Sequence, residues 1–210
     1  RIKRFIYASS SSVYGVSEQK DVTEDHPFLP LTLYNKYKGM CEPILLNQTD
    51  NNFEGLIFRP ATVCGYAPRQ RLDLSVNILT NHAINKNKIT IFGGEQLRPN
   101  LHIQDYCDFV KLAIQSPTEK IKNQQFNVGY QNLSMTEIGK LVKKVVESEF
   151  MDKSDIDLVF TKSDDKRSYH ICSDKVKAVL GFQPKYSIED AVKELFEHFK
   201  KGEFKNPFED

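Results

Sequence analysis

The sequence predicts an α/β fold with a parallel sheet in at least its first third. Runs rich in aromatic and β-branched residues alternate along the chain with runs of helical periodicity, and this alternation is typical of α/β proteins. The composition is that of a globular protein, since 40% of the 210 residues are hydrophobic and 11% are aromatic. A chain of this length is expected to form one domain, or one domain and a small partner.

Two predicted strands flank a predicted helix near the start of the chain. The first strand covers residues 4–8, and the buried run FEGLIFR predicts a second over 53–59. Residues 33–47 are expected to be helical, with Pro43 kinking or shortening the helix because proline lacks a backbone donor. The polar, proline-marked stretch 17–30 is expected to be a long loop, and loops of that length usually have a function.

The alternation continues after a turn expected over 60–65. Ser134 and Glu137 form a capping-box pattern ahead of one helix, and a serine also precedes the last helix. In chain order the predicted elements are a helix over 72–84, a strand over 88–92 closed by Gly93-Gly94, a strand over 100–103, a helix over 103–115, a strand over 125–128, and helices over 136–149 and 187–200.

Charge and cysteine usage exclude several classes of function. The 29 Lys and Arg against 28 Asp and Glu leave a net charge of +1, without the basic excess of duplex-binding proteins. No uncharged apolar run approaches the roughly 18 to 20 residues of a membrane-spanning helix. The four cysteines lie at least 23 residues apart and form no CxxC pair. We therefore expect no nucleic-acid or membrane partner, no metal site and no disulfide framework, in a reduced, cytoplasmic protein.

Tyr34 and Lys38 are four residues apart on a predicted helix, so both side chains lie on one face. A phenol is a poor base near neutral pH, but a nearby ammonium favours the phenolate, which can accept a proton from a substrate hydroxyl. Taken alone, such a pair is close to chance frequency. Upstream, the serine run 9–12 follows a strand end, where open parallel sheets bind ligands. Ser10 is suited to hydrogen-bond the same substrate oxygen, and the alternative is a solvated turn.

Six segments together resemble one enzyme superfamily. They are ASSSSVYG (8–15), YNKYK (34–38), FRPATVCG (58–65), RPNLHIQD (98–105), DKRSY (165–169) and LGFQPK (180–185). Over nearly the whole chain the sequence resembles the extended short-chain dehydrogenase/reductases, and within them the NAD-dependent nucleotide-sugar epimerase/dehydratase group. The resemblance implies the C-terminal part of a Rossmann-type doubly wound parallel sheet plus a small α/β substrate-binding domain. Residues 1–65 would then belong to the NAD-binding domain and 66–210 mainly to the nucleotide-sugar-binding region, with some segments returning to the Rossmann sheet.

The resemblance also implies roles for individual residues. Tyr34 matches the active-site tyrosine, Lys38 the lysine that holds the nicotinamide ribose, and Ser10 the hydroxyl residue that completes the triad. Cofactor contacts are implied for Ser9, Tyr34, Lys38, Pro60 and Thr62. Substrate contacts are implied for Ser10, Ser11, Thr62, Asn77, Arg98 and Arg167. Arg98 is matched to the diphosphate, which a guanidinium binds in a fork, and the alternative is an exposed surface arginine.

Several positions depart from the family pattern. Thr62 replaces an asparagine of many epimerases, and Lys162 stands where many relatives have a second phosphate-binding arginine. Ser11 and Ser12 occupy the places where 4,6-dehydratases have acidic residues. The stretch 60–74 resembles a subgroup that acts on less common nucleotide sugars. The Gly-rich cofactor loop is missing from the sequence, so we expect a fragment that lacks roughly the first third of a family member.

The sequence thus predicts an NAD-dependent nucleotide-sugar epimerase-like enzyme that transfers hydride at a sugar carbon, commonly C4. One alternative is a nucleotide-sugar 4-dehydrogenase or ketoreductase, and another is a truncated binding fragment without turnover. The fragment alone is expected to be inactive, and a full-length parent to be a homodimer. The nucleotide, the sugar and the choice between NAD and NADP stay open, because the discriminating residue would lie upstream.

Overall fold

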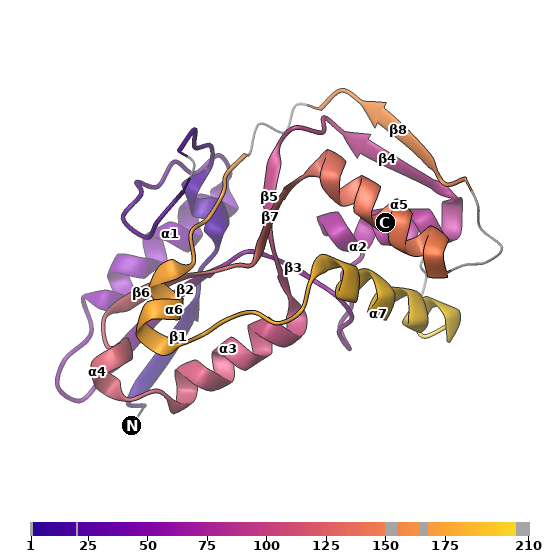
Figure 1. Cartoon of the computed structure of the whole chain (residues 1–210). Helices are drawn as coiled ribbons and strands as arrows, with labels where there is room; N and C mark the ends of the chain where they lie inside the picture. Colours follow the sequence, from indigo (N-terminus) through magenta and orange to yellow (C-terminus); the bar gives the residue numbers. More distant parts are fainter. Residues whose placement is uncertain (1, 20, 150–154, 164–167, 205–210) are drawn as a thin grey trace.

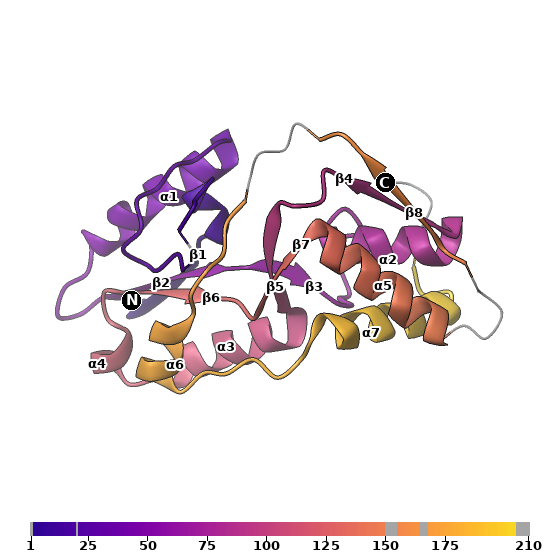
Figure 2. The same ribbon diagram turned by 45° about the horizontal axis from the view of Figure 1, so that its top comes forward.

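A parallel sheet of three strands forms one side of the molecule (Figure 1). In this computed structural model, which describes residues 2–19, 21–149, 155–163 and 168–204, the order is β1 (Arg4–Ala8), β2 (Glu54–Pro60) and β6 (Gln124–Val128). Helix α1 (Leu33–Leu46) lies on one side of this sheet, and α3 (Ile103–Gln115) and α6 (Asp174–Leu180) lie on the other (Figure 2). The expected α/β class and parallel sheet are confirmed.

A second group of elements packs beside this sheet. Helices α2 (Ser75–Lys86), α5 (Met135–Glu149) and α7 (Ile188–Lys200) pack together. They accompany a two-stranded parallel sheet of β4 (Lys88–Phe92) and β8 (Asp157–Thr161). The two groups therefore form two lobes, seen at the left and right of Figure 1.

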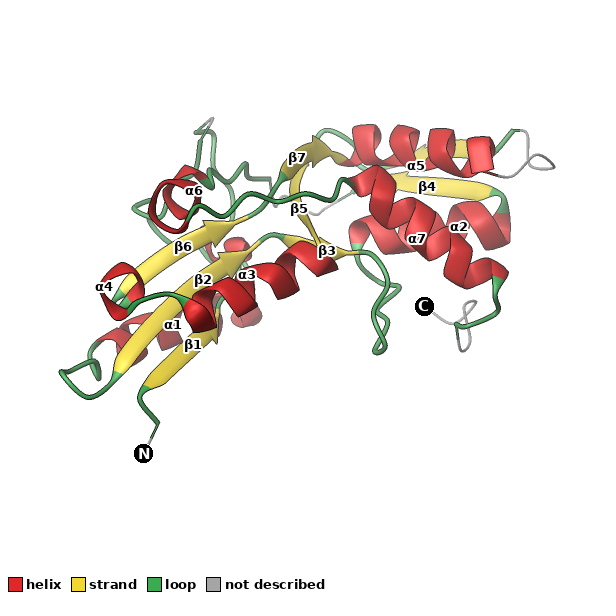
Figure 3. Cartoon of the chain, turned by 60° about the horizontal axis from the view of Figure 1, so that its bottom comes forward, coloured by secondary structure: helices red, strands yellow, loops and turns green. Residues whose placement is uncertain are grey.

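A third sheet lies between the lobes (Figure 3). Strand β3 (Thr62–Cys64) pairs parallel with β5 (Leu97–His102), which pairs antiparallel with β7 (Gln131–Ser134). Because β3 follows β2 after a single residue, the chain passes directly from the first sheet into this one. Short helical elements complete the fold at η1 (Ser11–Tyr14) and α4 (Thr118–Ile121).

The buried side chains form two clusters, one in each lobe. Phe58, Phe109 and Phe126 belong to the first cluster, and Ile91 and Ile138 belong to the second. Along the chain, buried residues alternate between the clusters in the ranges 13–61, 64–91, 101–128, 138–156, 169–182 and 188–196. The lobes are therefore interleaved in sequence. Across the described residues, no helix combines the length and apolar character that crossing a membrane requires.

Several boundaries differ from those expected. The turn expected over 60–65 is wrong, because β2 extends through Pro60 and β3 follows it, pairing with β5. Pro43 does not end α1, which continues through Leu46 beyond the proline. The helix expected from residue 72 begins at Ser75. The strand expected over 100–103 is the longer β5.

Candidate active site

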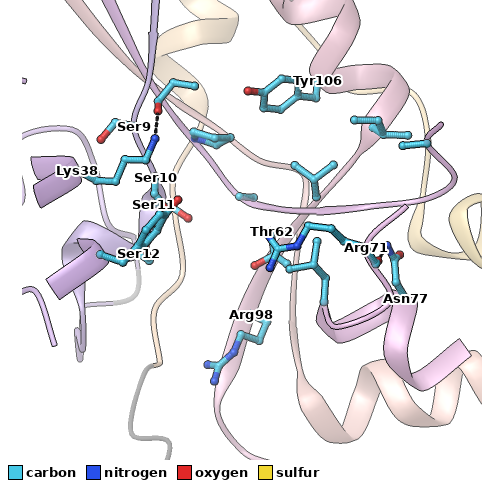
Figure 4. A pocket seen from close by; sticks show the side chains of 18 of the residues that line it. Ser9, Ser10, Ser11, Ser12, Lys38, Thr62, Arg71, Asn77, Arg98 and Tyr106 are labelled. Carbon is cyan, nitrogen blue, oxygen red and sulfur yellow. Dashed lines mark hydrogen bonds between the residues drawn. The ribbon is translucent and has the colours of Figure 1, made fainter. Parts of the chain in front are cut away.

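The carboxyl ends of β1 and β2 open into a cavity of about 960 Å³ between the lobes. Open parallel sheets bind ligands at this edge. Figure 4 shows Ser9 to Ser12 and Lys38 on one side, with Thr62, Arg71, Asn77 and Arg98 on the other. Apart from Arg167, every site residue expected from the sequence lines this cavity, namely Ser9, Ser10, Ser11, Tyr34, Lys38, Pro60, Thr62, Asn77 and Arg98. Arg167 lies outside the described residues.

The serine run forms a tight turn at the end of β1. Ser10 is the N-cap of η1, and its Oγ accepts the Ser12 backbone N–H at 3.2 Å. The Oγ atoms of Ser10 and Ser12 are 2.7 Å apart, and Ser12 Oγ donates to Asn35 Oδ1 at 2.8 Å. These bonds link the serine turn to α1 and fix the place of the Ser10 hydroxyl. Ser11, in contrast, is buried.

Helix α1 brings Tyr34 and Lys38 to the same cavity. Thr32 caps the helix, because its Oγ1 accepts the Asn35 N–H at 3.2 Å. Lys38 Nζ donates to the carbonyl of Ala8 at 2.7 Å and lies 5.8 Å from the centre of the Tyr34 ring. The Tyr34 side chain is 59% exposed and therefore accessible to a ligand. The expected i, i+4 pair thus lines the same cavity as the serine turn.

A buried charge network holds the serine turn and α1 together. Arg59 of β2 pairs with Glu42 of α1 at 2.6 Å, and both side chains are at most 3% exposed. Arg59 Nη1 donates to the Tyr14 hydroxyl at 2.7 Å, and that hydroxyl donates to Asn127 Oδ1 at 2.7 Å. Burial raises the pKa of Tyr14 to about 12, so the phenol stays neutral. None of these roles was predicted from the sequence, because the partners are far apart in the chain.

The opposite wall is a loop that begins at Gly65. Gly65 has a φ of +100°, and a Cβ there would lie 2.9 Å from Glu194 Oε2. Asn77 Oδ1 accepts the Gly65 N–H at 3.1 Å, and Asn77 Nδ2 donates to the Arg71 carbonyl at 2.9 Å. Glu194 Oε2 accepts the Tyr66 N–H at 2.9 Å. The described hydrogen bonds of Asn77 therefore hold the loop, while the residue also lines the cavity.

The cavity is cationic. Lys38, Arg69, Arg71 and Arg98 line it, and none of its described lining residues is Asp or Glu. Arg71 forms an ion pair with Asp73 at 2.7 Å, and both side chains are more than half exposed. Asp73 itself does not line the cavity. Arg98 lies on β5, half-buried, and donates to the Leu97 carbonyl at 3.0 Å. Such a wall suits an anionic ligand with phosphate groups. Arg69 and Arg71 were not predicted as site residues, although both lie in the stretch 60–74 that the sequence analysis singled out.

The serine and α1 side of the cavity offers polar groups of the kind that a dinucleotide cofactor needs. Lys38 places an ammonium at the end of β1. The hydroxyl of Ser9 is buried and has no hydrogen-bond partner among the described residues, so a polar ligand group would satisfy it. The described residues contain no group of three His, Cys, Asp or Glu side chains placed to hold a metal ion.

A family model and individual known proteins that resemble this chain point to the same kind of enzyme. The model of the NAD dependent epimerase/dehydratase family matches residues 1–129. UDP-glucose 4-epimerase from Lactobacillus helveticus is 27% identical to this chain in an alignment 217 residues long. The alignment covers 91% of this chain and 62% of the relative.

Two solved structures resemble the fold closely. UDP-glucuronic acid 4-epimerase from Bacillus cereus, in complex with UDP-glucuronic acid and NAD, has a TM-score of 0.80 at 26% identity and covers 96% of this chain. UDP-glucose 4-epimerase from Thermotoga maritima, with UDP-glucose, has a TM-score of 0.81 at 26% identity and covers 97% of this chain. The chain spans 62% of the first of these structures and 65% of the second.

Proposed function

The chain belongs to the NAD dependent epimerase/dehydratase family, and on that basis we propose that it carries the catalytic and substrate-binding part of an NAD-dependent nucleotide-sugar 4-epimerase. The observation that carries this proposal is that Ser10, Tyr34 and Lys38 line one cavity together with Arg98. Both matched solved structures were determined with UDP-sugars, and one of them also with NAD. Nucleotide sugar and NAD are therefore the ligands that we propose here.

The proposed reaction begins with oxidation of a sugar hydroxyl. Tyr34, as the phenolate, accepts the hydroxyl proton, and Ser10 hydrogen-bonds the same oxygen. Lys38 keeps the site cationic beside the Tyr34 ring. When bound, NAD would supply the acceptor for the hydride that leaves the carbon and the donor for its return to the opposite face. After the keto sugar turns, Tyr34 gives the proton back, and the stereocentre is inverted with no net redox change.

The cationic wall is proposed to bind the diphosphate. Arg98 is half-buried on β5, and Arg69 and Arg71 come from the loop after Gly65. Guanidinium groups bind phosphate oxygens through paired, charge-assisted hydrogen bonds. The sugar would then extend from the arginines toward Tyr34 on the opposite wall.

The cavity lining argues against 4,6-dehydration by this protein. That reaction requires an acid and a base at C5 and C6 in addition to the oxidation, and carboxylates supply them well. Ser11 and Ser12 stand at the relevant positions, and the described lining of the cavity contains no carboxylate. We therefore propose a product with the mass of the substrate, and a product lighter by one water would contradict this.

The test of the catalytic assignment is Tyr34→Phe in the whole protein, meaning the longest form that its gene encodes. The variant keeps the ring and loses the base, so turnover should fall by about 10²- to 10⁴-fold. Tyr130→Phe is the control, because Tyr130 is also exposed and does not line the cavity. Turnover of Tyr34→Phe within about threefold of wild type, a difference below 1 kcal/mol, would contradict the assignment.

The same assay separates the alternatives. An epimerase releases the inverted sugar without accumulating reduced cofactor, whereas a 4-dehydrogenase forms one NADH for each sugar oxidised. A binding protein without turnover would bind the nucleotide sugar and form neither product.

We also propose a homodimer that uses α1. Leu33, Tyr37, Met40 and Ile44 recur at helical spacing on α1, and each is at least 50% exposed. Such a stripe is wide enough to pack against a second helix. Met40→Lys should therefore shift the whole protein toward monomer in sedimentation. A wild-type protein that sediments as a monomer would contradict the proposal.

A further inference from the structure

Asn35 follows Tyr34 on α1 and is linked to Ser10 through Ser12. Ser12 Oγ donates to Asn35 Oδ1 at 2.8 Å, and the Ser12 and Ser10 hydroxyls are 2.7 Å apart. Asn35 is only 1% exposed, although it lies along the cavity. Its Nδ2 atom is buried and has no hydrogen-bond partner among the described residues. Buried N–H groups without an acceptor are rare, so this amide requires an explanation.

The number of hydroxyl hydrogens determines whether Ser10 can donate a hydrogen bond to the substrate. A hydroxyl has one hydrogen to donate and two lone pairs. When Ser12 donates to Asn35, it has no hydrogen left for Ser10, so Ser10 must donate within their 2.7 Å contact. Ser10 also accepts the Ser12 backbone N–H. In this arrangement Ser10 can accept a hydrogen bond from a substrate oxygen but cannot donate one.

Turning the Asn35 amide by 180° reverses the direction of the hydrogen bonds that link Asn35, Ser12 and Ser10. The turn exchanges the positions of oxygen and nitrogen, which differ little in size. Nδ2 then donates to Ser12 Oγ, Ser12 donates to Ser10, and the hydrogen of Ser10 is available to a substrate oxygen. The buried amide nitrogen gains an acceptor, and a carbonyl oxygen is left without a partner instead, which is less unfavourable.

We propose that Asn35 is a positioning residue that directs the Ser10 hydrogen toward the substrate oxygen, with the amide in this turned orientation. The proposal rests on the proposed function, because it assumes that oxidation occurs at that oxygen. Negative charge develops there when the proton passes to Tyr34. A donor already aimed at the oxygen stabilises this charge without reorganising during the reaction.

Asn35→Asp in the whole protein tests the direction of the hydrogen bonds that link Asn35, Ser12 and Ser10. An ionised carboxylate only accepts hydrogen bonds, so Ser12 must donate to it and Ser10 must donate to Ser12. We expect kcat to fall at least about tenfold at pH 8, with KM changed less than about threefold. The ratio of variant to wild-type kcat should rise as the pH is lowered, because a protonated carboxyl can donate again.

Ser12→Ala supplies the rescue. Removing the Ser12 hydroxyl disconnects the carboxylate of the Asn35→Asp variant from Ser10, so the double variant should recover kcat to within about threefold of Ser12→Ala alone. A wild-type kcat in Asn35→Asp, or no recovery in the double variant, would overturn the proposal.

A second measurement does not depend on activity. In the unliganded protein, nitrogen-15 NMR can follow hydrogen exchange of the Asn35 side-chain amide. The proposal expects one slowly exchanging Nδ2 hydrogen that becomes fast in Ser12→Ala. Equal exchange in the two proteins would overturn the hydrogen-bond direction, whatever the enzyme does. Wild-type turnover in Tyr34→Phe would instead overturn the proposed function. Failure of the hydrogen-bond proposal and failure of the proposed function are therefore distinguishable.

Discussion

At the scale of single residues, Arg98 gives the sharpest test of which ligand the cavity takes. It is half-buried on β5, across the cavity from the serine turn and Lys38. We expect Arg98→Ala to raise KM for the nucleotide sugar by about 10- to 100-fold, because a hydrogen bond to a charged group contributes about 1.5–3 kcal/mol. The kcat should change little, since the arginine is not proposed to contact the reacting carbon. Steady-state kinetics measure both constants.

Arg98→Lys is the matched variant, because it keeps the charge and loses the fork. Its KM should lie between those of wild type and Arg98→Ala. An unchanged KM in Arg98→Ala, with kcat reduced instead, would contradict a role in diphosphate binding.

Part of the site at this scale could be predicted from the sequence. Spacing alone places Tyr34 and Lys38 on one helix face, whereas the roles of Ser10, Tyr34 and Lys38 rest on the resemblance of six segments to a family and remain predictions. The link between Glu42, Arg59 and Tyr14 could not be predicted, because it joins three elements through contacts that sequence spacing does not encode. The role proposed for Asn35 depends on the contact between its side-chain amide and Ser12 Oγ, which only the structure shows.

At the scale of elements, capping boxes define the start of two helices. Ser187 Oγ accepts the Asp190 N–H at 3.2 Å, and the Ser187 N–H donates to Asp190 Oδ2 at 2.7 Å. Ser134 and Glu137 repeat this pattern before α5, as the sequence predicted. Hydrogen bonds from the Ser187 backbone and hydroxyl lower the pKa of Asp190 below its ordinary value of 3.8.

Asp190 therefore makes stability depend on pH. Its pKa is lower in the folded state, so its contribution is fully present above the ordinary value of 3.8 and is lost as the pH falls through the folded pKa. We expect Asp190→Asn to destabilise the protein at pH 7 by about 0.5–1 kcal/mol, with a smaller loss below about pH 3. Urea denaturation at several pH values measures this.

Glu189→Gln is the control, because it removes a charge from the same helical turn but leaves the capping box of Ser187 and Asp190 unchanged. An effect of Asp190→Asn that stays constant from about pH 7 to about pH 2.5 would contradict the assignment.

The elements that the sequence did not predict are mostly short. β3 and β7 have three and four residues, too few to show an alternating pattern. Both are stabilised by pairing with β5, which is a tertiary contact. The longer helices α3 and α7 were predicted closely, because an apolar stripe repeated over several turns is a strong signal.

At the scale of the whole molecule, the two buried clusters are expected to unfold together. Ile138 is fully buried in the second cluster, and Leu56 is fully buried in the first. Ile138→Ala should lower the free energy of unfolding by about 2–5 kcal/mol. Because the chain alternates between the clusters, amide hydrogen exchange in β2 should accelerate by the same free energy as exchange in α5.

Ile114→Ala is the control, because Ile114 is 58% exposed and should change exchange little in either lobe. Unchanged exchange in β2 alongside faster exchange in α5 would show that the lobes unfold independently.

The interleaving of the lobes also limits how such a molecule can diversify. Moving the second lobe intact from one relative to another would need five breakpoints, one at each passage between the clusters. A single recombination event therefore leaves both cores mismatched. Replacing the short loop that follows Gly65 disturbs neither core, yet it changes Arg69 and Arg71 in the cavity. New ligand preferences are accordingly expected to arise through loop exchange and point substitution rather than through shuffling of whole lobes.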